Sequence, residues 1–93
     1  MQLYLLRPKP RAPGDDPWKP WYDKCFGFVI AAESVADARQ LAHKSAGDEN
    51  RGNFLGKMIA NTQSPWLDEK YTSCRVLQPS ETPEVIIRDF HAA

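Results

Sequence analysis

The chain has 93 residues, with 12 Lys plus Arg against 12 Asp plus Glu and a formal net charge of zero. This length suits one small domain with one modest core. A balanced charge argues against nucleic acid as a partner, because binding to phosphates needs surplus cations. No apolar run approaches the roughly 20 residues of a membrane span and no signal peptide is visible, so we expect a cytoplasmic protein without a membrane partner.

Strand-forming runs and a proline-rich loop open the chain. Residues 3–6 predict a first strand, and residues 23–32, rich in aromatic and β-branched types, predict a second. Between them, residues 8–20 hold five of the eight prolines. Proline lacks a backbone N–H, so we expect a mobile loop there with its turn tip around Gly14.

The helix that follows has both ends marked. Ser34 can accept a hydrogen bond from a free N–H of the first turn, and Asp37 places negative charge at that end. Residues 35–46 have helical apolar spacing, and Gly47 suits a left-handed C-terminal cap. The alanine-rich face predicts close packing on a sheet, with four side chains buried: Val35, Ala38, Leu41 and Ala42.

The second half of the chain is less regular. Within residues 50–63, apolar spacing predicts a short second helix capped by Asn53. Two glycines in and beside this segment weaken that helix, so an irregular loop stays open as the alternative. Residues 64–67 begin with a cap followed by proline and predict one helical turn. Residues 72–77 and 84–90 predict the third and fourth strands.

The order of these elements is strand, strand, helix, short second helix, strand, strand. It predicts a single α+β domain over residues 1–93. The sheet is expected to be four-stranded and mainly antiparallel, with one main helix, and the second helix if it forms, packed on one face.

Three large aromatics fall within five residues at the end of the proline-rich loop: Trp18, Trp21 and Tyr22. With Lys19 they form the candidate protein-binding surface, and Trp66, which follows a proline, is a further candidate. We expect Trp18 to be exposed, because the prolines on both sides keep it off the sheet. Trp21 and Tyr22 adjoin the second strand and are expected to pack against it, so a structural role stays open for both, and equally for Trp66.

Catalytic and metal chemistry is weakly signalled. Cys74 could join Asp89 and His91 of the last predicted strand as a thiol nucleophile with its base, although no local cysteine-enzyme signature is present. Nothing marks the chain as secreted, so Cys25 and Cys74 are expected to be free thiols. A further polar group lacks the ligand spacing of metal sites, and we expect a solvated loop there without metal or cofactor: His43, Asp48 and Glu49.

Several pieces of the chain together resemble a known group of proteins. They are WYDKCFGFVIAAES, the helix ADARQLA with AGDE after it, WLDEKYTSC and the ending VIIRDFHAA. From Trp21 onward the chain resembles small proteins of this size encoded by bacteriophages and prophages of bacteria, with residues 50–63 as extra material. The resemblance implies no catalytic residues. It implies a phage-type accessory or host-interaction role.

The residues and the resemblance together predict a non-enzymatic binding module that acts through contact with another protein. A small thiol enzyme using Cys74 or His91 is the alternative. The second alternative is a weak binder of single-stranded nucleic acid that uses the aromatic and basic side chains of the N-terminal loop.

Overall fold

The described chain forms a three-stranded sheet, a small two-stranded ladder, one main helix and short 3₁₀ turns. A computed structural model describes residues 1–19, 21–50, 53–54, 57–58 and 64–90. Its elements are β1 (Gln2–Pro8), β2 (Phe28–Ala32), helix α1 (Val35–Ser45), the 3₁₀ turn η1 (Asp48–Asn50), β3 (Asn53–Phe54), β4 (Lys57–Met58), the 3₁₀ turn η2 (Pro65–Leu67) and β5 (Thr72–Val76).

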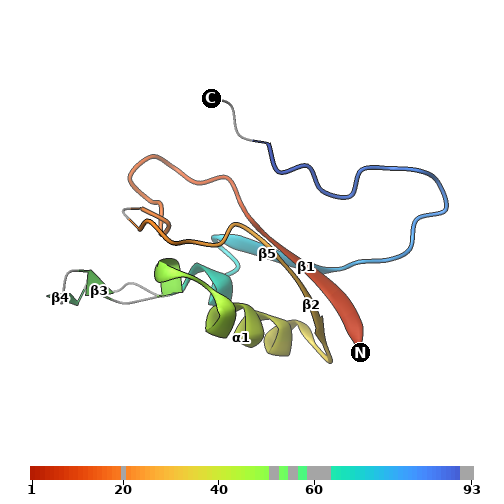
Figure 1. The fold of residues 1–93 in the computed structure, drawn as a ribbon, viewed down its shortest axis with the longest axis horizontal. Helices are drawn as coiled ribbons and strands as arrows, with labels where there is room; N and C mark the ends of the chain where they lie inside the picture. Colours follow the sequence, from red (N-terminus) through yellow and green to blue (C-terminus); the bar gives the residue numbers. More distant parts are fainter. Residues whose placement is uncertain (20, 51–52, 55–56, 59–63, 91–93) are drawn as a thin grey trace.

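Three strands form an antiparallel sheet in the order β2-β1-β5, with the N-terminal strand in the centre (Figure 1). Leu5 of β1 lies opposite Val29 of β2 and Arg75 of β5. A central strand is covered at both edges, and β1 holds three consecutive buried side chains: Tyr4, Leu5 and Leu6. The α+β class and three of the expected strands therefore agree with the structure, although β2 begins at Phe28 rather than at residue 23.

The expected four-stranded sheet is wrong. Residues 84–90 pair with no strand of the described chain, and the sheet has three strands. β-branched side chains favour an extended backbone, but a strand also needs a neighbouring edge to supply hydrogen bonds. The chain leaves β5 through a connection that contains Pro79 and Pro83. It then runs along the side of the sheet opposite α1 (Figure 1).

Helix α1 packs on one face of the sheet through two alanines. Ser34 caps the helix as predicted, because its Oγ accepts a hydrogen bond from the Asp37 amide at 3.1 Å. Ala38 and Ala42 are completely buried. Such small side chains let a helix approach its neighbours closely.

Two other side chains of α1 correct the prediction. Val35 and Leu41 were expected to be buried, and both are 44% exposed. For Leu41 the cause is Arg39, whose guanidinium donates hydrogen bonds to the carbonyls of Trp66 and Thr72, both at 2.9 Å. Arg39 and Leu41 project from opposite flanks of the alanine pair. Turning the Arg39 flank toward η2 and β5 therefore turns Leu41 toward solvent.

The end of α1 also differs from the prediction. Gly47 does not adopt a left-handed conformation, and the cap at Ala46 has φ −70° and ψ 166°. Glycine is needed here for a different reason. A Cβ atom at Gly47 would lie 2.9 Å from the Cα of Lys24 and closer still to the carbonyl of Asp23. The absence of a side chain thus lets two loops meet, and the Asp48 amide donates to the Asp23 carbonyl at 2.5 Å.

In the segment between η1 and η2, residues 50–63, a short helix capped by Asn53 was expected, with an irregular loop as the alternative. Residues 53–54 and 57–58 instead form a two-residue antiparallel ladder, β3 with β4, that includes Asn53. The rest of the expected helix lies outside the described residues. The turn expected after Ser64 is present as η2: Ser64 Oγ accepts from the Trp66 amide at 3.3 Å, and Pro65 is its first residue.

Candidate protein-interaction surface

The aromatic residues singled out by the sequence are mostly buried. Trp18 is 1% exposed and Trp66 is 0% exposed, so the expectation of an exposed Trp18 is wrong. Trp21 is buried as expected, at 6%. Tyr22 was expected to pack against the sheet but is 87% exposed, and Lys19 is exposed as well. Only two of the five candidate residues therefore present their side chains to solvent.

The proline-rich loop turns at Gly14, where the sequence places its tip. Gly14 has φ 86°, a left-handed conformation that glycine adopts without strain. The Asp15 amide donates to the Ala12 carbonyl at 3.0 Å and closes the turn. The Tyr71 hydroxyl donates to Asp15 at 2.5 Å, and Lys70 forms an ion pair with it at 3.1 Å. The Tyr71 bond, helped by Lys70, lowers the pKa of Asp15 from its ordinary value of 3.8.

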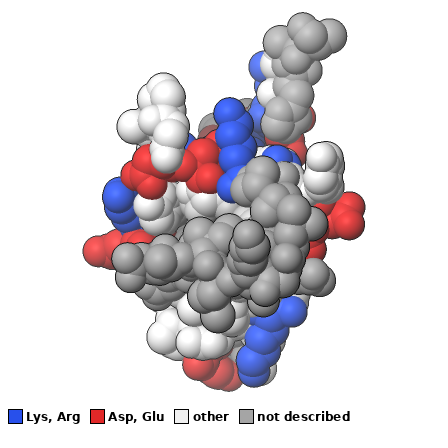
Figure 2. Space-filling view, turned by 90° about the vertical axis from the view of Figure 1, so that its left-hand side faces the viewer, with Lys and Arg blue, Asp and Glu red and all other residues white. Residues whose placement is uncertain are grey.

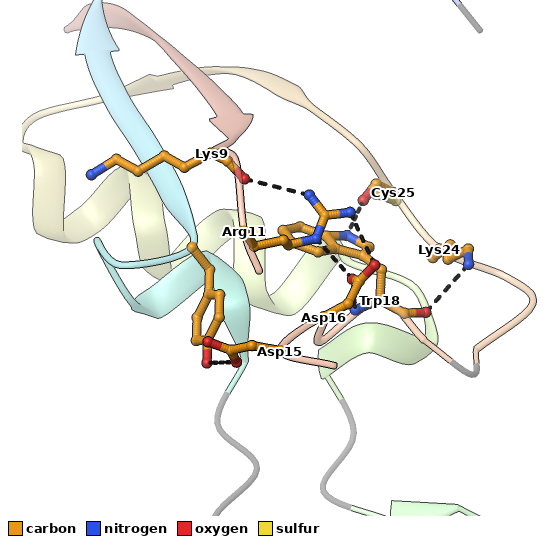
Figure 3. Close-up of polar contacts among 8 residues, drawn as sticks. Lys9, Arg11, Asp15, Asp16, Trp18, Lys24 and Cys25 are labelled. Atoms are coloured by element: carbon orange, nitrogen blue, oxygen red, sulfur yellow. Dashed lines mark hydrogen bonds and ion pairs between the residues drawn. The ribbon is translucent and has the colours of Figure 1, made fainter. Parts of the chain in front are cut away.

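Asp16 and Arg11 hold the loop against the indole of Trp18 (Figure 3). Asp16 accepts from the Trp18 amide at 3.0 Å and forms an ion pair with Arg11 at 2.9 Å. The Arg11 guanidinium lies 4.5 Å from the centre of the Trp18 ring, within cation–π range. Burial opposes the ionisation of Asp16, but the hydrogen bonds from Arg11 and Trp18 outweigh it and lower its pKa. Side chains thus tie down a loop that its prolines keep off the sheet.

The two buried indoles meet edge to face. The ring centres of Trp18 and Trp66 are 5.7 Å apart, with an angle of 85° between the ring planes. Trp18 Nε1 donates to the Cys25 carbonyl at 2.7 Å, and Trp66 Nε1 donates to Glu49 Oε1 at 3.0 Å. Both indoles satisfy their N–H groups inside the protein, so they act as core residues.

Glu49 is the buried group that the sequence pattern missed. Its side chain is fully buried, and the expectation of a solvated loop is wrong for this residue. Oε1 also accepts from the amides of Cys25 at 2.9 Å and Gly47 at 3.3 Å, whereas Oε2 has no hydrogen-bond partner among the described residues. No local pattern marks this role, because Cys25 and Trp66 lie 24 and 17 residues away along the chain.

Cys25 and Cys74 are free thiols with raised pKa values. Burial is the main cause for both; the charge of Glu49 adds to it at Cys25, and Arg39 opposes it at Cys74. A nucleophilic cysteine needs a lowered pKa, so these surroundings do not favour a thiol enzyme. His91 lies outside the described residues. Within the described ranges, no group of His, Cys, Asp and Glu side chains could hold a metal ion.

The face of the sheet that points away from α1 is apolar and partly uncovered. Side chains alternate along a strand. Tyr4 and Leu6 of β1 pack in the core with α1, so the alternate residues Leu3, Leu5 and Arg7 lie on the opposite face of the sheet. Leu3 and Val29 are 51% and 58% exposed on that second face. Seven residues make up this open face: Leu3, Leu5, Arg7, Val29, Ala31, Ser73 and Arg75.

Residues 84–90, named the C-terminal arm, lie on the side of the sheet opposite α1 (Figure 1), and two of them approach the open face. Ile87 of the arm shares a pocket of about 400 Å³ with Leu5, and Asp89 lies 3.8 Å from the Arg7 guanidinium. Between 43% and 78% of each large apolar side chain of the arm is exposed: Val85, Ile86, Ile87 and Phe90. The arm and the open face together form one surface with many exposed apolar groups.

Charged side chains of both signs are mixed elsewhere on the surface. On the side of the molecule seen in Figure 2, the described Lys and Arg side chains are interspersed with Asp and Glu side chains. Arg11, a basic residue of the N-terminal loop, is paired with Asp16. The loop therefore does not present all of its positive charge to a partner.

Comparison of the chain with protein-family models, with curated proteins and with solved structures finds no match. Among the described helices, none is long and apolar enough to cross a membrane. The functional argument therefore rests on the geometry of the surface.

Proposed function

We propose that this protein is a non-enzymatic binding module that acts through protein–protein contact. Its contact surface is the C-terminal arm together with the open face. The observation that carries this proposal is that Leu3 and Val29 of the open face and all four large apolar side chains of the neighbouring arm are exposed. Apolar groups gathered in this way are typical of surfaces that bind proteins.

The loop around Tyr22 is a second, smaller candidate surface. Tyr22 is 87% exposed and Lys19 beside it is exposed as well. With Trp18 and Trp66 in the core, this surface offers one aromatic ring where the sequence suggested several. The arm and the open face offer more apolar area, and for this reason we favour them.

The two alternative functions have less support. A thiol enzyme would need a reactive thiolate, and burial raises the pKa of both cysteines. A binder of single-stranded nucleic acid would stack bases on exposed rings, but Trp18 and Trp21 are buried. A phage-type accessory or host-interaction role suits a small module with this surface. Two free thiols suit a cytoplasmic location.

Site-specific photo-crosslinking tests the proposal. A photoreactive residue is placed at Val85 or Phe90 of the arm, at Tyr22 of the loop, or at the matched exposed position Glu69. We expect a discrete crosslinked protein species from the two arm positions and none from Glu69. A species from Tyr22 alone would move the site to the loop. No species from any position would contradict the proposed function.

A further inference from the structure

The apolar surface raises the question of which partner it fits. Resting on the proposed function, we propose that the partner is a second copy of this chain, and that the C-terminal arm of each copy packs on the open face of the other. Such a pair has twofold symmetry, so each contact between arm and face forms twice.

The charges of the two parts are complementary. The open face carries Arg7 and Arg75, and none of its other five residues is charged. The arm carries Glu84 and Asp89 against Arg88, which leaves it with one net negative charge. A surface that fits an apolar and positive face must be apolar and negative. This chain carries such a segment next to that face.

Contacts within one chain show that arm and face are compatible, but they leave the arm incompletely covered. Asp89 and Arg7 are 3.8 Å apart, with side chains that are 49% and 28% exposed. Ile87 lines the pocket over Leu5 and is still 46% exposed, while Val85 is 78% exposed. The arm lies on its own open face and cannot bury its outer side against the same sheet. A second molecule can cover that side.

Each copy of the chain carries both an arm and an open face, so two copies can form the interface without a third molecule. In a twofold pair, the exposed apolar side chains of the arm meet the Leu3 and Val29 side chains of the other copy. Removal of this area from water on both copies drives association, and the charged groups fix the orientation.

The first test is the mass of the full chain in solution. Sedimentation equilibrium over a wide range of concentrations should show a species of twice the 10.6 kDa chain mass. Arg7→Glu and Asp89→Arg each turn an attraction into a repulsion at both symmetric contacts. Each variant alone should raise the dissociation constant of the pair by about tenfold. Glu69→Arg, on an exposed residue outside the surface, should leave it unchanged.

Mixing the two variants separates contacts between copies from contacts within one chain. In a pair made of one Arg7→Glu chain and one Asp89→Arg chain, position 7 of each copy meets an opposite charge at position 89 of the other. We therefore expect the mixture to pair about as tightly as the unmodified chain, while each variant alone pairs weakly. A contact made only within one chain would be repulsive in both variants, and mixing could not restore it.

A second pair of positions keeps the test independent of folding. Arg7 also donates to the Phe26 carbonyl at 2.8 Å, so Arg7→Glu can unfold the chain as well as alter the surface. Arg75 and Glu84 are both exposed and line one pocket. Arg75→Glu mixed with Glu84→Arg repeats the experiment at these positions.

The outcomes distinguish this inference from the proposed function. A doubled mass that is lost in the single variants and restored in the mixture supports it. A chain that stays monomeric at every concentration overturns it. If that monomer still crosslinks through Val85 to a different protein, the proposed function stands and only the identity of the partner is wrong. If it crosslinks to nothing, both fail.

Discussion

Substitution of the buried carboxylate Glu49 tests how the interior is held together. Glu49→Ala removes the acceptor of three N–H groups: the amides of Cys25 and Gly47 and Trp66 Nε1. These groups join the loop before β2, the end of α1 and η2. We therefore expect the substitution to lower the free energy of unfolding of the whole domain.

The magnitude follows from the three contacts. A hydrogen bond to a charged acceptor contributes about 1.5–3 kcal/mol, so three bonds at the lower end contribute about 5 kcal/mol. Burial of Oε2, which has no hydrogen-bond partner among the described residues, destabilises the unmodified protein by about 1–3 kcal/mol. Alanine removes this unfavourable contribution and so offsets part of the loss. The expected net loss is about 2–4 kcal/mol, out of the roughly 5–14 kcal/mol that stabilises a domain of 93 residues.

Urea denaturation followed by tryptophan fluorescence measures this loss. Glu69→Ala, on an exposed carboxylate, is the matched control and should change the free energy of unfolding by less than about 0.5 kcal/mol. Glu49→Gln keeps an acceptor oxygen and the shape of the side chain, so it should cost about 1 kcal/mol, the difference between charged and neutral hydrogen bonds.

A double-mutant cycle isolates one of the three bonds. Trp66→Phe removes the indole donor, so Glu49→Ala should cost about 1–2 kcal/mol less in that background than in the unmodified chain. The reasoning would be refuted if Glu49→Ala unfolded at the same urea concentration as Glu69→Ala.

Three further predictions concern the loop and the thiols. Trp18→Ala should cost about 3–5 kcal/mol of stability and Tyr22→Ala less than about 0.5 kcal/mol; equal melting temperatures would contradict this. The pKa of Asp16 is lowered in the folded protein, so its carboxylate stabilises the fold at pH values above the unfolded pKa, and this stability is lost as the pH falls through the folded pKa. The free energy of unfolding of Asp16→Asn should therefore fall less steeply than that of the unmodified chain between neutral pH and about pH 2. Cys25 and Cys74 should react with a disulfide reagent more slowly than glutathione at neutral pH, and a fast phase would reveal a thiolate.

Local signals in the sequence located several elements of this fold. The Ser34 cap and the alanine spacing placed α1, the Ser64-Pro65 pair placed η2, and Gly14 marked the loop tip. Each of these signals works between residues a few positions apart, because a cap or a turn is completed by its nearest neighbours along the chain. Such features can be predicted without knowledge of the rest of the molecule.

The candidate surface depended on contacts between residues far apart along the chain. The sequence shows the prolines beside Trp18 but not that Trp18 and Trp66 meet in the core, so Trp18 was expected to be exposed. Glu49 looked solvated because two of its three donors come from other segments.

The C-terminal arm has the composition of a strand, but strand pairing requires an edge in reach, and the connection after β5 carries the arm to the open face instead. Composition set which side chains are apolar. The tertiary arrangement decided which of them are buried and which are left for a partner, because burial depends on the position of every neighbouring segment.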